Sequence, residues 1–98
     1  MKYSLDSTAQ YDEWFDALKD RQTRARVVAR LARIEMGNLG DHKQLTDKLW
    51  ELRFTIAGGL RIYYAIREET VVLLLCGGNK TRQSKDIARA EKLIDELE

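Results

Sequence analysis

Three basic side chains in the second half of the chain have the charge and spacing to bind a phosphate group. Arg53 and Arg61 occupy polar positions in two segments of alternating polarity, and Lys80 follows a glycine-rich turn. Cations grouped in this way can hold an anion and stabilise the negative charge that develops on a phosphate during cleavage. Tyr63, at a similar alternating position, could stack on a base or move a proton. Glu51 is the only acid expected on this face.

The same residues also have a purely structural interpretation. Arg53 and Arg61 could pair with Glu51 and Glu68, and Lys80 could be an ordinary exposed residue. The glycines before Lys80 would let the backbone approach a phosphate closely, and the start of the following helix adds a partial positive charge. Spacing alone leaves phosphate binding and solvated surface charge both open.

A second group of basic residues belongs to helices. Arg26, Arg30 and Arg33 repeat at helical spacing on a face separate from the apolar one, and Arg82 and Lys85 lie near the start of the last predicted helix. The net charge is only +1 because the acids collect in other segments. The neutral total therefore conceals basic patches, which are either solvated helix faces or a surface for RNA or an acidic partner.

The first half of the chain predicts a strand and two helices. Residues 2–5 form a short strand, and Ser7 or Thr8 could cap the helix that follows. The second helix runs from Gln22 to Met36 and ends at Gly37, since glycine readily adopts the left-handed conformation that ends helices. The predicted apolar faces consist of Tyr11, Trp14, Phe15 and Leu18, and of Val27, Val28, Leu31 and Ile34.

The second half predicts a loop, three strands and a helix. Residues 37–48 are rich in Gly, Asp and Asn and indicate a loop. Residues 51–56 and 60–66 alternate between polar and apolar, whereas the run Val71–Cys76 is typical of a strand covered on both faces. The glycines after this run should end it, and a helix begins near Ser84. Its predicted buried side consists of Ile87, Ala90, Ile94 and Leu97.

The loop between the two alternating strands decides which residues face each other. A two-residue loop would place Ile56 opposite Arg61, an apolar residue beside a charge. A three-residue loop, Ala57–Gly59, avoids this and places Arg53 opposite Tyr63, so we favour it. Helices segregated from a small, mostly antiparallel sheet define an α+β fold.

Length and composition narrow the classes of protein. With 98 residues the chain predicts one domain over residues 1–98, too small for a deep dedicated cavity. The single cysteine, Cys76, and single histidine, His42, cannot form a disulfide or a metal cluster, and we expect no cofactor. Trp14 and Trp50 are expected in the core. No signal peptide or membrane span is visible, which favours the cytoplasm.

Several segments match a known pattern in order along nearly the whole chain. They are Trp14–Asp20, Met36–Asp41, Trp50–Arg53, Gly59–Tyr64 and Leu74–Ala90. Through them the sequence resembles the phage-derived killer-protein branch of the RelE/ParE toxin superfamily, which includes HigB-type toxins. The resemblance implies two N-terminal helices and a C-terminal helix packed on a small, mostly antiparallel sheet.

The resemblance also implies a function, that of the toxin of a type II toxin–antitoxin pair. Such toxins bind the ribosomal A site and cut mRNA without a metal, through attack of a ribose 2′-hydroxyl on the adjacent phosphate. Arg61 would then stabilise the transition state, Arg53 and Lys80 would position the phosphate, and Tyr63 or Glu51 would assist proton transfer. The remaining basic residues would bind RNA: Arg26, Arg30, Arg33, Arg82 and Lys85. The implied partners are the ribosome, mRNA and a small helix-turn-helix antitoxin.

One departure from the pattern leaves alternatives open. Several ribonucleases of this superfamily carry a tyrosine or histidine near the C-terminus, whereas here residues 94–98 contain neither. The general base is therefore unassigned. The superfamily also includes gyrase inhibitors that do not cleave RNA, and a non-catalytic basic binding module is a third possibility.

Overall fold

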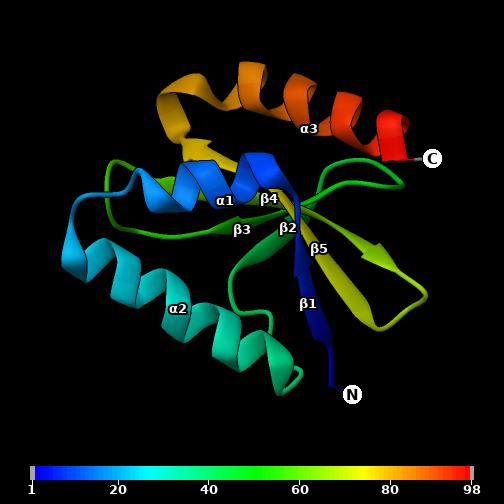
Figure 1. The fold of residues 1–98 in the computed structure, drawn as a ribbon, viewed down its shortest axis with the longest axis horizontal. Helices are drawn as coiled ribbons and strands as arrows, with labels where there is room; N and C mark the ends of the chain where they lie inside the picture. Colours follow the sequence, from blue (N-terminus) through cyan, green and yellow to red (C-terminus); the bar gives the residue numbers. More distant parts are fainter. Residues whose placement is uncertain (1, 98) are drawn as a thin grey trace.

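A mixed sheet with helices on both faces forms the framework of the protein (Figure 1). The computed structural model describes residues 2–97, and within them five strands lie in the order β1-β5-β4-β3-β2. β1 is parallel to β5, and all other neighbouring strands are antiparallel.

The strands are β1 (Ser4–Ser7), β2 (His42–Gln44), β3 (Trp50–Arg53), β4 (Leu60–Arg67) and β5 (Val71–Asn79). The helices are α1 (Ala9–Asp16), α2 (Arg21–Glu35), the 3₁₀ turn η1 (Lys80–Arg82) and α3 (Gln83–Leu97). The predicted α+β fold is confirmed.

Polar caps fix where the N-terminal helices begin. The Thr8 side chain accepts a hydrogen bond from the Tyr11 backbone N–H at 3.0 Å, and Asp20 accepts one from the Thr23 N–H at 3.2 Å. These bonds satisfy amides that have no partner within the first turn of a helix. Gly37, with φ of 98°, follows the end of α2, as predicted.

Two cores form, one on each face of the sheet. The α1 and α2 side contains the buried residues Tyr11, Val27, Ile34, Leu52, Phe54, Leu60, Ile62, Tyr64, Val72 and Leu74. The α3 side contains Leu49, Tyr63, Ala65, Leu73, Leu75, Cys76, Ala90, Leu93 and Ile94. Successive residues of β4 alternate between these two cores, because side chains of a strand point to opposite faces. β5 is covered on both faces, as its continuous apolar sequence predicts.

The predicted pairing of β3 and β4 is wrong by two positions. Arg53 lies opposite Arg61, and Tyr63 lies opposite Glu51. The loop is longer than three residues, because Ala57 joins the two glycines after it in a left-handed conformation and the Leu60 N–H bonds back to the Ile56 carbonyl at 3.0 Å. A shift of two keeps every side chain on its predicted face.

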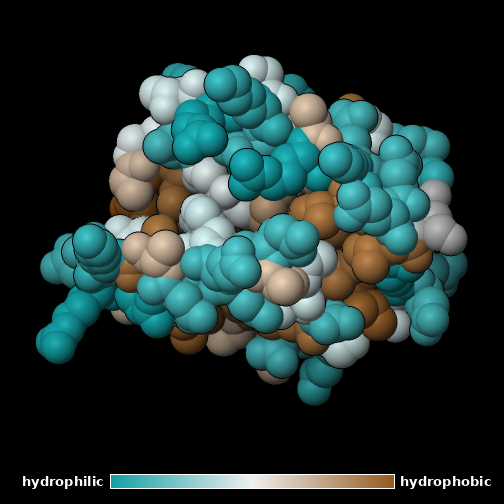
Figure 2. Space-filling model, turned by 45° about the horizontal axis from the view of Figure 1, so that its top comes forward, coloured by the Kyte–Doolittle hydropathy of each residue, from teal (hydrophilic) through white to brown (hydrophobic). Residues whose placement is uncertain are grey.

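Other boundaries also differ from the prediction. The predicted loop 37–48 contains the short strand β2, and β5 continues through its glycines to Asn79 instead of ending at Cys76. Val28 and Leu97, assigned to apolar faces, are about half exposed. In the view of Figure 2, which brings α3 forward, most of the surface is hydrophilic and apolar surface lies in patches between. None of the helices between residues 2 and 97 is both long and apolar enough to span a membrane.

Candidate functional site

Two arginines face each other across neighbouring strands at one end of the sheet. Arg53 of β3 and Arg61 of β4 are directly paired, so both side chains leave the sheet on the α3 side. Like charges at directly opposed positions destabilise a sheet. Each arginine has its own carboxylate partner, Asp41 for Arg53 and Glu51 for Arg61. An anion that binds between the two guanidinium groups would relieve their mutual repulsion.

Arg53 is held only at the surface. Its Nη2 and Nε donate to Asp41 Oδ1 at 3.0 and 3.2 Å. Both side chains are well exposed, at 36% and 56%, so the pair contributes at most about 1 kcal/mol and a phosphate can displace it.

Arg61 is held more firmly. Its Nη1 donates to the carbonyls of Gly59 and Leu60 at 3.1 and 3.2 Å, and Nε lies 3.9 Å from Glu51 Oε1. Glu51 is buried and accepts a hydrogen bond from Gln83 Nε2 at 2.9 Å. Glu51 and Gln83 therefore orient the guanidinium from beneath, and Glu51 lies too deep to meet a large substrate directly. Gln83, at the first position of α3, was not among the predicted site residues.

Lys80 lies close to Arg61 at Gly59. A side chain at Gly59 would meet Cβ of Lys80 at 3.0 Å and Nη1 of Arg61 at 3.5 Å. The absence of a side chain there lets both cations approach the loop between β3 and β4. Lys80 is exposed and opens η1, which the Asn79 side chain caps by accepting from the Thr81 N–H at 3.1 Å. The structure thus places Arg53, Arg61 and Lys80 on one surface, hereafter the cation site.

Tyr63 does not belong to the surface of the cation site. Its ring is fully buried in the α3-side core, so the predicted stacking on a base is wrong. Its hydroxyl has no hydrogen-bond partner among the described residues. Burial, with added effects of Glu51 and Asp86, raises the pKa of Tyr63 well above its usual value. The phenol stays protonated at neutral pH and cannot serve as a general base there.

Tyr63→Phe is expected to leave both stability and activity close to those of the unaltered protein. The change removes a hydroxyl that makes no hydrogen bond and keeps the ring, so unfolding free energy should change by less than about 1 kcal/mol. Denaturant unfolding and an assay of the mRNA cleavage that the family resemblance implies measure the two quantities. A loss of activity of about 100-fold or more would instead give the hydroxyl a direct role in proton transfer.

Asp86 of α3 is a buried acid that sequence patterns did not single out. It is 4% exposed, and Oδ2 has no hydrogen-bond partner within residues 2–97. Burial raises its pKa above the ordinary value, and Arg82 and Arg89 lower it in part. Its spacing from Ala90 places it on the buried side of α3, which is the one signal that could have revealed it.

The raised pKa of Asp86 predicts how Asp86→Asn alters stability with pH. The folded state binds the proton more tightly than the unfolded state, so this carboxyl destabilises the fold once pH rises above its unfolded pKa. Asparagine carries no such charge. The variant should melt a few degrees higher at neutral pH, and the gain should vanish below pH 3.8, the ordinary value. Thermal melts of both proteins across this pH range measure the effect. A difference in melting temperature that stays constant with pH would contradict the assignment.

The arginines of α2 divide into structural and available groups. Arg30 donates from Nη2 to the Arg53 carbonyl at 2.9 Å and lies 4.3 Å from the centre of the Phe54 ring. It therefore fastens α2 to the end of β3. Arg26 and Arg33 are exposed and border a small cavity of about 90 Å³ beside the loop after β3. Two cations were predicted near the start of the last helix. Arg82, at the end of η1, and Lys85, in α3, are exposed as well.

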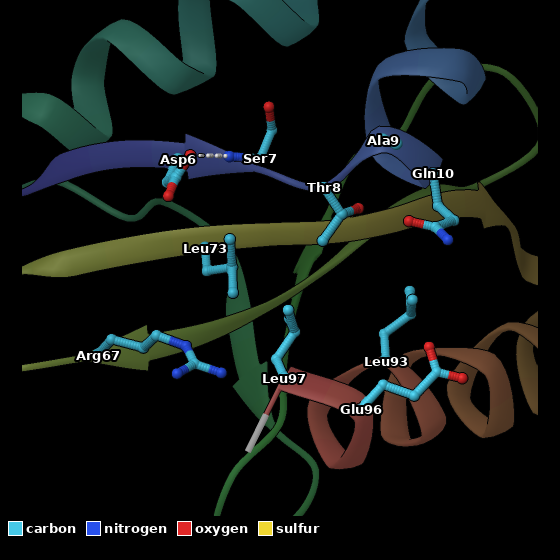
Figure 3. A pocket seen from close by; sticks show the side chains of 10 residues that line it. All are labelled: Asp6, Ser7, Thr8, Ala9, Gln10, Arg67, Leu73, Leu93, Glu96 and Leu97. Atoms are coloured by element: carbon cyan, nitrogen blue, oxygen red, sulfur yellow. Dashed lines mark hydrogen bonds between the residues drawn. The ribbon is translucent and has the colours of Figure 1, made fainter.

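A cavity away from the cation site lies at the other end of the sheet. It has a volume of about 580 Å³ and is lined by the end of β1, the start of α1 and the C-terminal turns of α3. Figure 3 shows Arg67 of β4 and Leu93, Glu96 and Leu97 of α3 around it. Arg67 ends the strand that Arg61 nearly begins, so the two sites are at opposite ends of β4. In the described part of the chain, no three His, Cys, Asp or Glu side chains are placed to hold a metal ion.

The arrangement of helices and strands defines the class of protein. The chain matches a free, doubly arginine-substituted mutant of the Escherichia coli toxin RelE with a TM-score of 0.74 and 19% identity, over 94% of this chain and 97% of that one. It matches the intact E. coli RelBE toxin–antitoxin complex with a TM-score of 0.65 and 19% identity, over 79% and 95%. At these identities the likeness shows that the fold is that of RelE.

Sequence similarity gives the family. The model of the phage-derived Gp49-like proteins matches residues 13–95, so the chain belongs to this family of RelE/HigB type, and the predicted membership of the RelE/ParE superfamily is confirmed. An uncharacterized protein of Haemophilus influenzae strain Rd is 38% identical and is aligned over 99% of this chain and 98% of its own length.

Proposed function

We propose that this protein is the toxin of a type II toxin–antitoxin pair and that it cleaves mRNA on the ribosome. The observation that carries the proposal is the cation site, where Arg53 and Arg61 are directly opposed and Lys80 lies close to Arg61 at Gly59. Three cations within one small surface suit a phosphate whose negative charge increases during the reaction. The family supports the assignment, because RelE/HigB-type proteins are toxins.

The proposed reaction uses the RNA itself as nucleophile. The ribose 2′-hydroxyl gives up its proton to solvent and its oxygen attacks the adjacent phosphorus. The bond to the 5′-oxygen of the next nucleotide breaks, and that oxygen takes a proton from solvent. The products are a 2′,3′-cyclic phosphate and a 5′-hydroxyl end. Arg61 stabilises the charge on the non-bridging oxygens, and Arg53 and Lys80 position the phosphate. Glu51 and Gln83 position Arg61 from below.

The exposed helical cations supply the remaining contacts in this proposal. Arg26 and Arg33 of α2, Arg82 at the end of η1 and Lys85 of α3 bind ribosomal or messenger phosphates without regard to sequence. The E. coli RelE toxin forms a complex with the antitoxin RelB. By analogy we propose an antitoxin for this chain, a small helix-turn-helix protein that neutralises it in the cytoplasm.

Mapping of 5′-hydroxyl RNA ends after induced expression tests the proposal. We expect new ends within codons of translated messages, together with arrest of growth. A reporter mRNA whose start codon is mutated is the matched control, and it should stay intact because no ribosome translates it. Growth arrest with intact mRNA and stalled DNA supercoiling would contradict cleavage and indicate gyrase as the target. Expression without any effect on growth would indicate a non-catalytic binding module.

A further inference from the structure

The side of α2 that faces away from the sheet carries exposed apolar residues. Val28 is 55% exposed, and Met36, at the end of α2, is 68% exposed. Within residues 2–97 the only other large apolar side chain with comparable exposure is Leu97 of α3. Three exposed alanines belong to the same side of α2: Ala25, Ala29 and Ala32. These alanines with Val28 and Met36 are hereafter the outer face of α2.

The spacing of these residues makes the outer face one continuous surface. Val28, Ala32 and Met36 recur every four residues, so they form one of the ridges that interlock when two helices pack. The other two alanines form the neighbouring ridge. Val27, which is fully buried against the sheet, lies on the opposite side of the helix. The outer face therefore runs along α2 for roughly 16 Å, or about three turns.

Unpaired cations line one edge of the outer face. Arg26 and Arg33 lie three and four positions from Ala29, so they are its neighbours on the helix surface. Neither guanidinium has a hydrogen bond or an ion pair among the described residues. Glu35 is the only acid within α2. A partner that covers the outer face must therefore supply negative charge along the arginine edge.

Apolar surface beside cations distinguishes between possible occupants. RNA phosphates would use the arginines, but they would gain nothing from Val28 and Met36. A second copy of this chain would match the apolar ridge. However, antiparallel packing of two α2 helices sets their arginine edges against each other, and like charges at an interface are costly. An amphipathic helix with acids beside its apolar ridge suits both features of the surface.

We propose that the outer face of α2 is the docking surface for an acidic amphipathic helix of a partner protein. Apolar side chains of that helix pack on the ridge that contains Val28 and Met36, and its carboxylates pair with Arg26 and Arg33. The bound helix takes up cations that we assign to RNA, so partner and RNA compete for α2. The cation site stays open, because α2 lies on the side of the sheet away from α3 (Figure 1). The inference rests on the proposed function only in this competition, since docking itself needs no RNA.

A synthetic helix tests the docking surface on the full-length chain. The probe peptide has three heptads, with leucine at the first and fourth positions of each, glutamate at the flanking fifth and seventh positions, and alanine elsewhere. In NMR titrations the methyl signals of Val28 and Met36 should shift, and those of Leu97 should not. The same peptide with lysine in place of glutamate is the matched control, and it should bind at least about tenfold more weakly. Absence of binding, equal binding of the two peptides, or shifts confined to other elements would each overturn the inference.

Two pairs of variants separate the apolar contribution from the charged one. Met36→Ser should weaken binding of the acidic peptide about tenfold, whereas Leu97→Ser makes a similar change outside the outer face and should not alter it. Arg33→Gln should weaken binding about threefold at low salt and hardly at high salt, whereas Arg89→Gln, at an exposed position of α3, should have no effect. An acidic peptide that binds all four variants equally would overturn the inference. A dimer of the free chain that Met36→Ser dissociates, measured by light scattering, would do so too, because a second copy would then cover this face.

The outcomes separate this inference from the proposed function. If the acidic peptide binds but translated mRNA stays intact, α2 is a docking surface and the proposed cleavage is wrong. If mRNA is cleaved but the peptide does not bind, the docking proposal is wrong and the cation site stands. Where both hold, the acidic peptide should weaken binding of a short oligouridine about as much as Arg26→Gln and Arg33→Gln together do. RNA binding that the peptide leaves unchanged would overturn the competition.

Discussion

Arg61→Ala is expected to lower mRNA cleavage by about 100- to 1,000-fold, the usual effect of removing one donor that stabilises an oxyanion. Arg61 lies between Glu51 and Lys80 and opposite Arg53, so its loss removes the most firmly held cation of the site. Cleavage of a translated reporter and recovery of growth after induction measure the effect.

Two further arginine variants sharpen this test. Arg61→Lys keeps the charge but loses the planar fork, so it should retain activity between those of Arg61→Ala and the unaltered protein. Arg21→Ala removes an exposed cation at the start of α2, outside the cation site, and should cleave nearly as well as the unaltered protein. Undiminished cleavage by a folded Arg61→Ala protein would remove Arg61 from the proposed mechanism.

Gly77→Ala is expected to destabilise the fold by about 3 kcal/mol, the upper part of the range for overpacking a core. The added methyl group would overlap the Trp14 ring, and Gly77 lies in β5, which has β4 beside it and helices over both faces. The backbone therefore cannot move away at low cost. Denaturant unfolding measures the loss, and a variant as stable as the unaltered protein would show that α1 can shift freely.

Two controls isolate the steric cause. Gly58→Ala has no atom within 4 Å of the new methyl group but sits at φ of +71°, so it should cost only about 1 kcal/mol from backbone strain. In Trp14→Leu the ring is absent, and Gly77→Ala added to that background should cost clearly less than it does alone. If the losses of stability from Trp14→Leu and Gly77→Ala simply add in the double variant, the added methyl group does not clash with the Trp14 ring.

Alternating sequence predicted the face of each strand residue but not how deep it lies. Arg53 and Arg61 share a face, as the period of two requires, and the error of two positions in register did not change that. Tyr63 and Glu51 share the face too, yet they are buried because α3 covers that part of the sheet. The sequence of a strand does not show whether a helix from a distant part of the chain covers it, so the depth of these residues could not be predicted.

The loop after β3 and the two glycines of β5 could not be predicted from local sequence patterns, each for a different reason. Nothing in the residue type of Ala57 indicates a left-handed conformation, which is uncommon for a residue with a side chain, and this conformation lengthened the loop. The role of Gly77 and Gly78 depends on side chains that arrive from α1 and α3. The family resemblance indicated the fold and the kind of substrate that we propose, while the contacts of the cation site required coordinates.

The pairing of β1 with β5 has a consequence for how the protein is made. β1 is the first strand in the chain, yet its partner residues are Val71 to Leu74, so the two segments meet only after most of the chain has been synthesised. Parallel pairing between such distant segments slows folding, because a long loop must close before the contacts form. Lys80 also follows β5 in the chain. A nascent chain on the ribosome therefore holds an incomplete sheet and no cation site until its last third has emerged, so the activity that we propose for this site could begin only at the end of translation.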